Sequence, residues 1–274
     1  MGKLDSKVAV ITGSTRGIGK TIAEAYVREG AKVVVASRNK AHVEHALSGF
    51  PPGRVIGQVC DVSDYSDVEQ LVERAVEAFG KIDVFINNAG ITDTFYNVTD
   101  SDPVEWGRIV DINLKGTYHG TRAALHYHLK AGHSLKIINM AGSGTDKKSN
   151  TPFISAYGST KAAIARFTFA AAEEYKEYPV SIMLLHPGLV RTDMTRAIQP
   201  TPEMKRQQET FETICDIFAQ PPSVAASLAV KMASDHGGTK NGDYLSALDQ
   251  KRRKWLLFTY PFRKLFNKID RRSW

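Results

Sequence analysis

The sequence predicts an α/β fold in which a doubly wound parallel sheet carries helices on both faces of a single domain. Short apolar runs rich in Val and Ile alternate with stretches in which apolar residues recur at helical spacing. Such runs are typical of parallel strands covered on both faces. A glycine-rich turn follows the first run. With 274 residues, 42% of them hydrophobic, the chain is long enough for one large buried core.

The expected elements alternate regularly. The first strand, residues 7–11, leads through the glycine-rich turn into a helix with Ile18, Ile22 and Tyr26 on one face, which ends at Gly30. Ser63 or Ser66 is the expected N-cap of a later helix. The remaining strands are expected at residues 32–36, 54–61, 82–87, 135–140, 180–186 and near 244–245, and the remaining helices at 68–79, 104–130 and 157–178. Ligands of such sheets bind at the carboxyl ends of the strands.

The positive net charge of +7 is concentrated at the end of the chain. Residues 251–274 hold nine of the 36 Lys and Arg residues but only one Asp, which leaves residues 1–250 with a net charge of −1. This distribution argues against a nucleic-acid partner, because no basic surface is spread over the fold. It divides the chain into an α/β domain over residues 1–250 and a basic, aromatic tail over residues 251–274.

Neither a membrane span nor a secretory signal is expected. No window approaches eighteen apolar residues, and the N-terminal MGKLDS carries no apolar run ahead of a cleavage site. Cys60 and Cys215 lie far apart and outside any Cys-x-x-Cys pair, which favours reduced thiols. The histidines show no metal-ligand spacing. We therefore expect a cytoplasmic protein without a metal site.

The turn after the first strand is a candidate phosphate site. Its sequence, TGSTRGIG over residues 12–19, stands between a strand and a helix. Glycine lets the backbone approach a diphosphate closely, and the N-terminus of a helix offers free N–H groups. The expected contacts are Gly13, Ser14, Thr15, Arg16, Gly17, Ile18 and Gly19. The G-x-x-x-G-x-G spacing departs from the common dinucleotide fingerprint.

The residues after the second strand indicate which dinucleotide binds. An acidic residue there would hold the ribose hydroxyls of NAD, whereas arginine accommodates the extra phosphate of NADP. This chain has Ser37 and Arg38 at that place, and Arg16 adds a second positive charge. A guanidinium pairs bidentately with phosphate. The alternative is two solvated surface arginines. We predict NADP(H) as the cofactor.

Tyr157 and Lys161 form a candidate acid/base pair at the start of a helix. A spacing of four residues puts the phenol and the ammonium on one helix face. A lysine cation, helped by a positively charged nicotinamide ring, stabilises a phenolate and lowers its pKa from ~10 toward neutrality. Tyr157 would then donate a proton to a carbonyl oxygen during reduction. A lone Y-x-x-x-K is by itself an ordinary helix start with exposed side chains.

Six motifs taken together resemble the short-chain dehydrogenase/reductase family, including its 3-oxoacyl-carrier-protein reductase-like carbonyl reductases. They are T-G-x-x-x-G-x-G from Thr12, Asp61-Val62, N-N-A-G from Asn87, N-x-x-G from Asn113, Y-x-x-x-K from Tyr157 and Pro187-Gly188. The resemblance covers residues 3 to 248. It implies a Rossmann-type domain, a nicotinamide cofactor, hydride transfer at a carbonyl or alcohol carbon, and a homo-oligomer, dimer or tetramer.

The resemblance also implies roles for individual residues. Tyr157 is the expected acid/base group, and Lys161 binds the nicotinamide ribose and tunes Tyr157. Asn113 holds a water in the proton relay, although an asparagine on a helix can also cap or kink it. The further expected cofactor contacts are Asp61, Val62, Asn88, Ala89, Gly90, Pro187, Gly188, Val190 and Thr192.

One departure from the family pattern concerns the group that polarises the substrate carbonyl. Relatives place a pair of serines directly after the strand that ends in Asn-x, and this chain has Ala141 and Gly142 at those positions. Ser143 is the next hydroxyl along the chain and the candidate replacement. A loop serine bonded to its own backbone is the alternative.

The substrate lid is expected at residues 191–222, because a mobile segment after the Pro-Gly turn can close over a site at the strand ends. Its apolar residues indicate a partly apolar carbonyl compound, although they can also be ordinary packing: Met194, Ile198, Met204, Phe211, Ile214, Ile217 and Phe218.

The basic tail has two competing interpretations. Phe262, Leu265, Phe266 and Ile269 share a helical face, which suits either packing against a neighbouring subunit or weak contact with an anionic membrane surface. The aromatic residues followed by Pro261 are expected to interrupt any long membrane helix, which favours the subunit contact.

The leading functional hypothesis is an NADPH-dependent carbonyl reductase acting on a small-molecule carbonyl or alcohol. The alternatives are an NAD(P)-dependent alcohol dehydrogenase acting oxidatively, and a catalytically silent relative that senses NADP. The retained Tyr157 and Lys161 argue against the silent relative.

Overall fold

Seven parallel strands form the central sheet of the protein, for which a computed structural model describes residues 2–146, 150–196 and 202–271. The strand order is β3-β2-β1-β4-β5-β6-β7. Residues 8–12 of β1 pair with residues 32–36 of β2, and residues 9–11 pair with residues 84–86 of β4. Strands β1 to β3 are thus added toward one edge of the sheet, and β4 to β7 are added toward the other edge. This change of direction between β1 and β4 opens a crevice beyond the carboxyl ends of these two strands. The strands are β1 (Val8–Thr12), β2 (Lys32–Ser37), β3 (Val55–Val59), β4 (Val84–Asn87), β5 (Leu135–Met140), β6 (Val180–His186) and β7 (Tyr244–Ser246).

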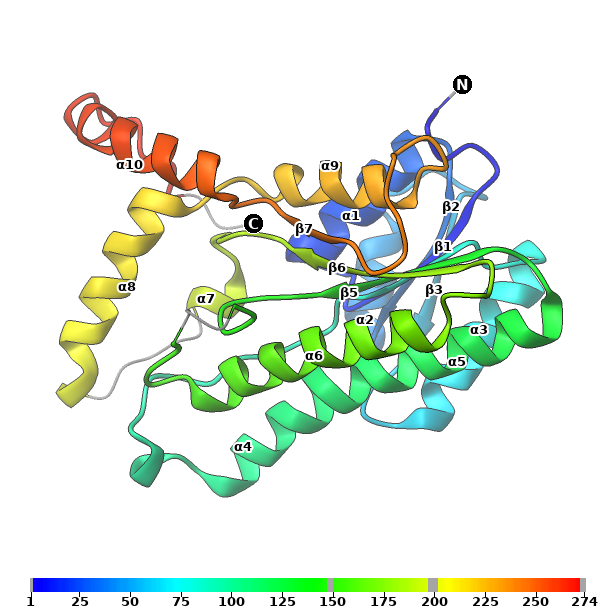
Figure 1. Cartoon of the computed structure of the whole chain (residues 1–274), viewed down its shortest axis with the longest axis horizontal. Helices are drawn as coiled ribbons and strands as arrows, with labels where there is room; N and C mark the ends of the chain where they lie inside the picture. Colours follow the sequence, from blue (N-terminus) through cyan, green and yellow to red (C-terminus); the bar gives the residue numbers. More distant parts are fainter. Residues whose placement is uncertain (1, 147–149, 197–201, 272–274) are drawn as a thin grey trace.

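Helices cover both faces of this sheet (Figure 1). One layer contains α1 (Gly17–Arg28) and α9 (Pro222–Ala233), and the other contains α3 (Tyr65–Phe79), α5 (Gly116–Ala131) and α6 (Ser155–Glu174). A separate apolar cluster fills the space on each side, with Ile22 and Tyr26 in one and Leu71 and Ile137 in the other. The predicted doubly wound α/β fold with helices on both faces is confirmed.

The element boundaries differ from expectation in several places. Two helices, α2 (Lys40–Leu47) and α9, were not foreseen. The expected helix 104–130 comprises α4 (Pro103–Val110), a π-helical turn η2 (Asp111–Lys115) and α5. A 3-10 turn η1 (Val98–Asp100) precedes them.

The cap of α3 corrects another expectation. Asp64 is the N-cap, because its carboxylate accepts a hydrogen bond from the Ser66 N–H at 2.8 Å. Neither Ser63 nor Ser66 is the cap. The Ser63 hydroxyl donates to Asp61 at 2.6 Å instead.

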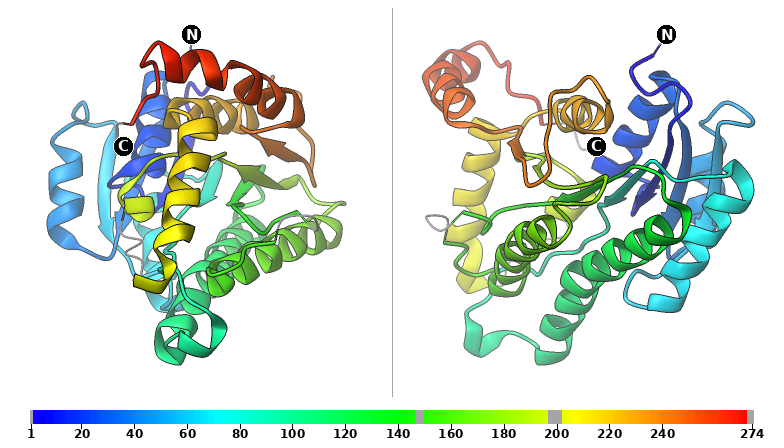
Figure 2. Two further views of the ribbon diagram at one scale, coloured as in Figure 1. Left: turned by 90° about the vertical axis from the view of Figure 1, so that its left-hand side faces the viewer. Right: turned by 45° about the vertical axis from the view of Figure 1, so that its right-hand side comes forward.

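The lid and the tail lie together at one side of the sheet (Figure 2). The lid comprises α7 (Asp193–Arg196), the 3-10 turn η3 (Pro202–Met204) and α8 (Lys205–Phe218); Ile198 lies outside the described residues. The tail forms α10 (Gln250–Leu265), which contains Pro261. Pro261 therefore lies inside this helix and does not end it. Among the described residues, no helix has both the length and the hydropathy to cross a bilayer.

Candidate active site

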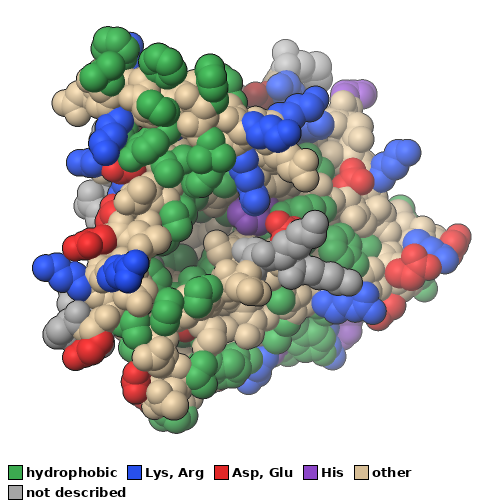
Figure 3. All heavy atoms as spheres, turned by 60° about the vertical axis from the view of Figure 1, so that its left-hand side comes forward, with side chains coloured by type: hydrophobic (Ala, Val, Ile, Leu, Met, Phe, Trp, Pro, Cys, Tyr) green, Lys and Arg blue, Asp and Glu red, His purple; other side chains and the backbone are tan. Residues whose placement is uncertain are grey.

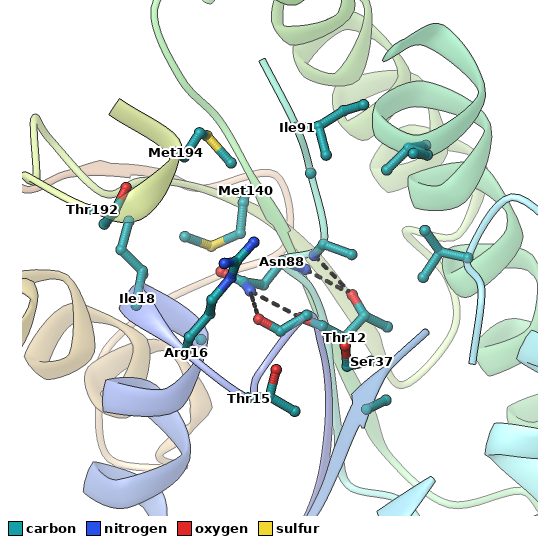
Figure 4. Close-up of a pocket in the computed structure, with 18 of the residues that line it drawn as sticks. Thr12, Thr15, Arg16, Ile18, Ser37, Asn88, Ile91, Met140, Thr192 and Met194 are labelled. Carbon is teal, nitrogen blue, oxygen red and sulfur yellow. Dashed lines mark hydrogen bonds between the residues drawn. The ribbon is translucent and has the colours of Figure 1, made fainter. Parts of the chain in front are cut away.

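The glycine-rich turn is held against the end of β4 by a set of short hydrogen bonds. The Thr12 hydroxyl accepts from the backbone N–H groups of Asn88 and Ala89, each at 3.0 Å. The Asn88 amide in turn donates to the carbonyl oxygens of Thr12 and Gly13 at 2.9 and 3.0 Å (Figure 4). A Cβ atom on Gly13, where φ is +61°, would lie 2.8 Å from the Ala89 Cα atom. The turn therefore requires glycine for both conformation and close approach.

The N-terminus of α1 faces a cavity of about 240 Å³ beyond this turn. Within the described part of the chain, no side chain caps α1 and no acidic residue stands in its first turn. Its leading N–H groups and the positive end of its dipole are thus available to an anion. The Arg16 guanidinium lies at the rim, 68% exposed, and pairs with Asp193 at 3.3 Å.

The structure brings most of the predicted site residues together around this cavity. Thr12, Ile91, Ile112, Met140 and Asp193 also line it and were not among the predicted site residues, and Met194 of the expected lid lines it too. Figure 4 shows Thr192, Met194 and Ile18 on one side of the view and Thr12 and Ser37 on the other. The predicted residues that line it are Gly13, Thr15, Arg16, Gly17, Ile18, Gly19, Ser37, Arg38, Asp61, Val62, Asn88, Ala89, Gly90, Tyr157, Lys161, Pro187 and Thr192.

Three predicted cofactor contacts do not line this cavity. The Ser14 side chain is fully buried, donates to the Ile11 carbonyl oxygen at 2.6 Å and accepts from the Ala36 N–H at 3.1 Å. It links β1 to β2. Val190 is buried, and Gly188 lines a neighbouring cavity.

The end of β2 carries the residues expected to select the dinucleotide. Ser37 is the last residue of β2 and Arg38 follows it, exposed, at the edge of the cavity. Asp61 lines the same cavity and follows Cys60, whose N–H donates to the Ser37 carbonyl oxygen at 3.1 Å. The Asp61 carboxylate accepts from the Ser63 N–H at 2.9 Å, and that bond fixes the turn into α3.

Tyr157 and Lys161 lie in the first two turns of α6 and both reach the cavity. The Lys161 ammonium is buried, donates to the Met140 carbonyl oxygen at 3.0 Å and lies 5.6 Å from the centroid of the Tyr157 ring. Burial lowers the pKa of Lys161 to about 8. Burial also raises the pKa of the Tyr157 hydroxyl to about 12, and the Asp93 carboxylate adds to this rise.

These values correct the expected direction for Tyr157. Lys161 together with a positively charged nicotinamide ring was expected to bring the phenol toward neutrality, whereas burial and the Asp93 carboxylate raise its pKa here. In this structure Tyr157 is therefore a protonated group at neutral pH.

Asn113 lies in the π-helical turn η2, fully buried. Its Oδ1 accepts from the Ile91 N–H at 2.8 Å, and its amide donates to the Ile91 carbonyl oxygen at 2.9 Å and to the Thr160 hydroxyl at 3.1 Å. Asn113 thus ties the loop after β4 to α6, the helix that carries Tyr157. Such π-helical turns are frequent at functional sites.

The loop after β5 fits closely around Tyr157. A Cβ atom on Gly142 would lie 2.3 Å from the Tyr157 hydroxyl oxygen, so this position accepts no side chain unless Tyr157 moves. Ser143 is exposed and lines the neighbouring cavity, not the cavity that contains Tyr157. Gly142 lines the neighbouring cavity as well, and therefore separates it from the phenol.

This second cavity, of about 520 Å³, lies between the loop after β5, the lid and the first turn of α10. Phe211 of α8 packs edge-on against Phe95 with ring centroids 5.7 Å apart, which joins the lid to the loop after β4. Its other apolar walls and its cations are Phe153, Ile154, Leu189, Ile214, Phe218, Leu248, Arg206 and Arg253.

Two residues near the phenol were missed by sequence reasoning. His186 ends β6, lines the second cavity and accepts from the Gly188 N–H through Nδ1 at 3.0 Å; burial lowers its pKa to about 4, so the ring is neutral. A polar residue at the end of an apolar strand was the available signal. Asp93 is 8% exposed, and its pKa is raised by burial. In the sequence Asp93 lies among other polar residues of a loop, and no spacing or motif distinguished it from them.

The sequence and the structure are similar to those of several known proteins. Residues 7–203 match the family model described as short chain dehydrogenase. An uncharacterized oxidoreductase of Staphylococcus aureus (strain USA300) is 34% identical over 227 residues, which are 82% of this chain and 96% of the relative.

Two crystal structures are similar in fold and sequence. A short chain dehydrogenase from Bacillus anthracis matches with a TM-score of 0.77 and 27% identity, over 90% of this chain and 96% of the other. A 3-ketoacyl-(acyl-carrier-protein) reductase from Brucella melitensis, complexed with NADH, matches with a TM-score of 0.77 and 29% identity, over 91% of this chain and 99% of the other.

Proposed function

Because the chain belongs to the short-chain dehydrogenase/reductase family, a family of oxidoreductases that use a nicotinamide cofactor, we propose that it is an NADPH-dependent reductase of carbonyl compounds. One observation carries this proposal. The hydroxyl of the half-buried Tyr157 and the buried Lys161 ammonium line the same cavity as the glycine-rich turn. A proton donor, a cation and an anion site thus meet at the carboxyl ends of the strands, where such folds bind ligands.

The residues around the cavity fit a dinucleotide. The uncapped N-terminus of α1 and the Gly13, Gly17 and Gly19 backbone suit a diphosphate. Asp61 and Val62 would border the adenine, Asn88 to Gly90 the adenosine, and Pro187 to Thr192 the nicotinamide. A bound nicotinamide coenzyme supplies the hydride.

Two arginines support NADPH over NADH. Arg38 and Arg16 both line the cavity, and the end of β2 carries Ser37 and Arg38 in place of an acidic residue that would repel a ribose phosphate. A guanidinium offers this phosphate bidentate hydrogen bonds. The Arg16 pair with Asp193 is highly exposed and would exchange readily for a phosphate contact.

The proton for reduction comes from Tyr157. Its raised pKa keeps the hydroxyl protonated at neutral pH, so the residue is in the donor state that reduction requires. The Lys161 ammonium stabilises the negative charge left on the phenol after transfer, because it lies on the next turn of α6. Asn113 positions the Tyr157 helix through Thr160.

The second cavity is the proposed substrate site. Its walls are largely apolar, with aromatic side chains from the lid and from the loop after β4, which suits a partly apolar carbonyl compound. Ser143 on its wall is the proposed donor to the carbonyl oxygen, in place of the family serine. A substrate that reached from Ser143 to Tyr157 would pass Gly142, which lines the second cavity and lies against the Tyr157 hydroxyl.

We further propose a homo-oligomer built through α5 and α6. Large apolar side chains on these two helices are exposed, namely Tyr118, Leu129 and Phe169, at 40 to 52%. Exposed apolar side chains on neighbouring helices are typical of subunit interfaces.

The test of the proposed function is NADPH oxidation by the full chain with a panel of ketones, aldehydes and β-keto thioesters. We expect turnover of the more apolar members, a loss of at least about 10³-fold in Tyr157→Phe, and a loss of about 10²-fold in Ser143→Ala. NADPH binding by both variants, followed by nucleotide fluorescence, controls for an intact cavity. NADPH binding without turnover of any panel member would favour the silent sensor instead.

A further inference from the structure

The outward side of α10 carries an unusual set of apolar side chains. Trp255, Phe258, Phe262, Leu265 and Phe266 are 52 to 77% exposed, and their spacing of three and four residues puts them on one side of the helix, here called the outer face. Figure 3 shows hydrophobic side chains projecting from the upper edge of the molecule, where α10 lies. A water-facing helix surface is normally polar, so this face is the reverse of the usual pattern.

Contacts on the opposite side of α10 fix this orientation. Leu256 is buried, and the Arg263 guanidinium donates to the carbonyl oxygens of Ile217 and Leu256 at 2.7 and 3.1 Å. Arg252 donates to the Gln220 side chain at 2.9 Å. These bonds join α10 to the C-terminal end of α8 and to the segment after it. The side of α10 that carries Leu256, Arg252 and Arg263 already contacts the rest of the protein. The outer face therefore points away from the protein.

Cations accompany the outer face. Lys251, Lys254, Lys264 and Lys268 are exposed, and none of the ion pairs within the described ranges involves them. The Arg252 guanidinium lies over the Trp255 ring, 4.9 Å from its centroid. A row of aromatic and aliphatic side chains with lysines beside it suits a surface that is apolar inside and negatively charged at its boundary.

We propose that the outer face of α10 binds the surface of an anionic lipid membrane. The net charge of the tail favours this partner over a second copy of the chain. A symmetric contact through α10 would bring together two segments of net charge +8, and residues 1–250, with a net charge of −1, offer little to balance them. Anionic lipid headgroups attract each lysine, and the aromatic rings insert at the boundary of the acyl chains. The helix spans only about 16 Å from Trp255 to Phe266, so it lies in the membrane surface.

Membrane binding would also affect which substrates reach the second cavity, and this step rests on the proposed function. Arg253 of α10 and six residues of α8 line this cavity, so a docked α10 holds it next to the lipid. Apolar carbonyl compounds dissolved in the membrane would then be the substrates within reach.

Flotation of the full chain with lipid vesicles tests the proposal. We expect binding to vesicles of phosphatidylcholine with about 30% phosphatidylserine, on the order of ten-fold weaker binding to phosphatidylcholine alone, and weakening of the anionic contact by salt. The variant Phe258→Ser/Phe262→Ser/Leu265→Ser should bind the anionic vesicles at least about ten-fold more weakly. Its matched control is Val98→Ser/Tyr178→Ser, which changes two exposed apolar residues elsewhere and should bind like the unaltered chain.

A second variant keeps the apolar face intact. Lys254→Glu/Lys264→Glu should lose the preference for anionic over neutral vesicles. Failure of the full chain to float with anionic vesicles, or equal flotation of the triple serine variant, overturns the proposal. So does a dimer in sedimentation that the triple serine variant abolishes without any vesicle binding, because a second copy would then cover the face. Reduction of a water-soluble ketone by the triple serine variant is measured in the same preparations and should be unchanged, which separates this proposal from the proposed enzyme activity.

Discussion

At the scale of single residues, burial governs the chemistry of the candidate site. The Lys161 ammonium is enclosed beside the Met140 carbonyl oxygen, and this burial lowers its pKa to about 8. The same burial raises the pKa of Tyr157 to about 12. The pair therefore holds a neutral proton donor next to a cation through the neutral pH range, which is the combination that carbonyl reduction needs.

The pH dependence of reduction follows from these two values. Below about pH 8 Lys161 is charged, and above it the charge is lost while Tyr157 stays protonated, so we expect kcat for ketone reduction to fall as the pH rises through about 8. The measurement is kcat at saturating NADPH across this range. Lys161→Arg stays charged and should move the decline to higher pH, whatever its absolute rate. A decline at the same pH in both proteins would assign the titration to another group.

The cofactor preference can be tested at Arg38. Arg38→Asp replaces the guanidinium with a carboxylate that repels the ribose phosphate, so the Kd for NADPH should rise about 10²-fold while that for NADH changes little. Titration of nucleotide fluorescence with both coenzymes measures this. Arg54→Asp, an arginine outside the cavity, is the control. Equal losses for both coenzymes would refute the NADP assignment.

At the scale of elements, the lid is held from two directions. Its loop before α7 is tied to α8 by Arg191, which pairs with Glu212 and Asp216, each at 2.7 Å. Arg271 of the tail pairs with the same Asp216 at 2.7 Å and is the largest cause of the lowered pKa of that carboxyl. At the second cavity, the Phe211 ring of the lid packs edge-on against the Phe95 ring. The lid is thus attached to the tail by charge and to the loop after β4 by an aromatic contact.

Loss of the aromatic contact should affect substrate binding. Phe211→Ala removes an aromatic pair and a wall of the second cavity, so KM for an apolar ketone should rise about ten-fold with a much smaller change in Tm. Steady-state kinetics and thermal unfolding measure the two effects. Phe258→Ala removes a phenylalanine of α10 that is 74% exposed and should leave KM unchanged. An unaltered KM in Phe211→Ala would move the substrate away from this cavity.

At the scale of the whole molecule, the two cavities draw on different parts of the chain. The cavity with the glycine-rich turn is lined by residues between 12 and 194, whereas the second cavity also takes residues from α8 and α10. The tail, which continues beyond the residues that resemble the family, therefore contributes Arg253 to the proposed substrate site. Coenzyme binding and substrate selection are for this reason separable by mutation.

Arg253→Ala tests this separation. The substitution removes a cation from the wall of the second cavity, so KM for a ketone that carries a carboxylate should rise about ten-fold. The Kd for NADPH should stay within about two-fold, because Arg253 does not line the coenzyme cavity. Isothermal titration and steady-state kinetics give the two values. A matching loss of NADPH affinity would show that the tail supports the whole fold and not the substrate cavity alone.

Local spacing made much of the fold and the site predictable. The strand patterns, the glycine-rich turn and the four-residue interval from Tyr157 to Lys161 are properties of short segments, and the observed sheet and cavity contain them as expected. The N-cap of α3 was not recovered, because Ser63, Asp64 and Ser66 are all good caps and the choice depends on where the backbone turns. The helix through Pro261 was missed because its tertiary contacts outweigh the cost of the missing N–H.

The order of apolar runs and turn residues was therefore enough to identify a doubly wound sheet, its anion-binding turn and its candidate acid/base pair, since each depends on interactions within a few residues. The surroundings of these groups required three-dimensional packing. The distance from Gly142 to the Tyr157 hydroxyl, the approach of Asp93 and the outward orientation of the aromatic tail all arise where segments far apart in the chain meet. Solvation and charge at such contacts depend on every surface that is present, and no local pattern encodes them.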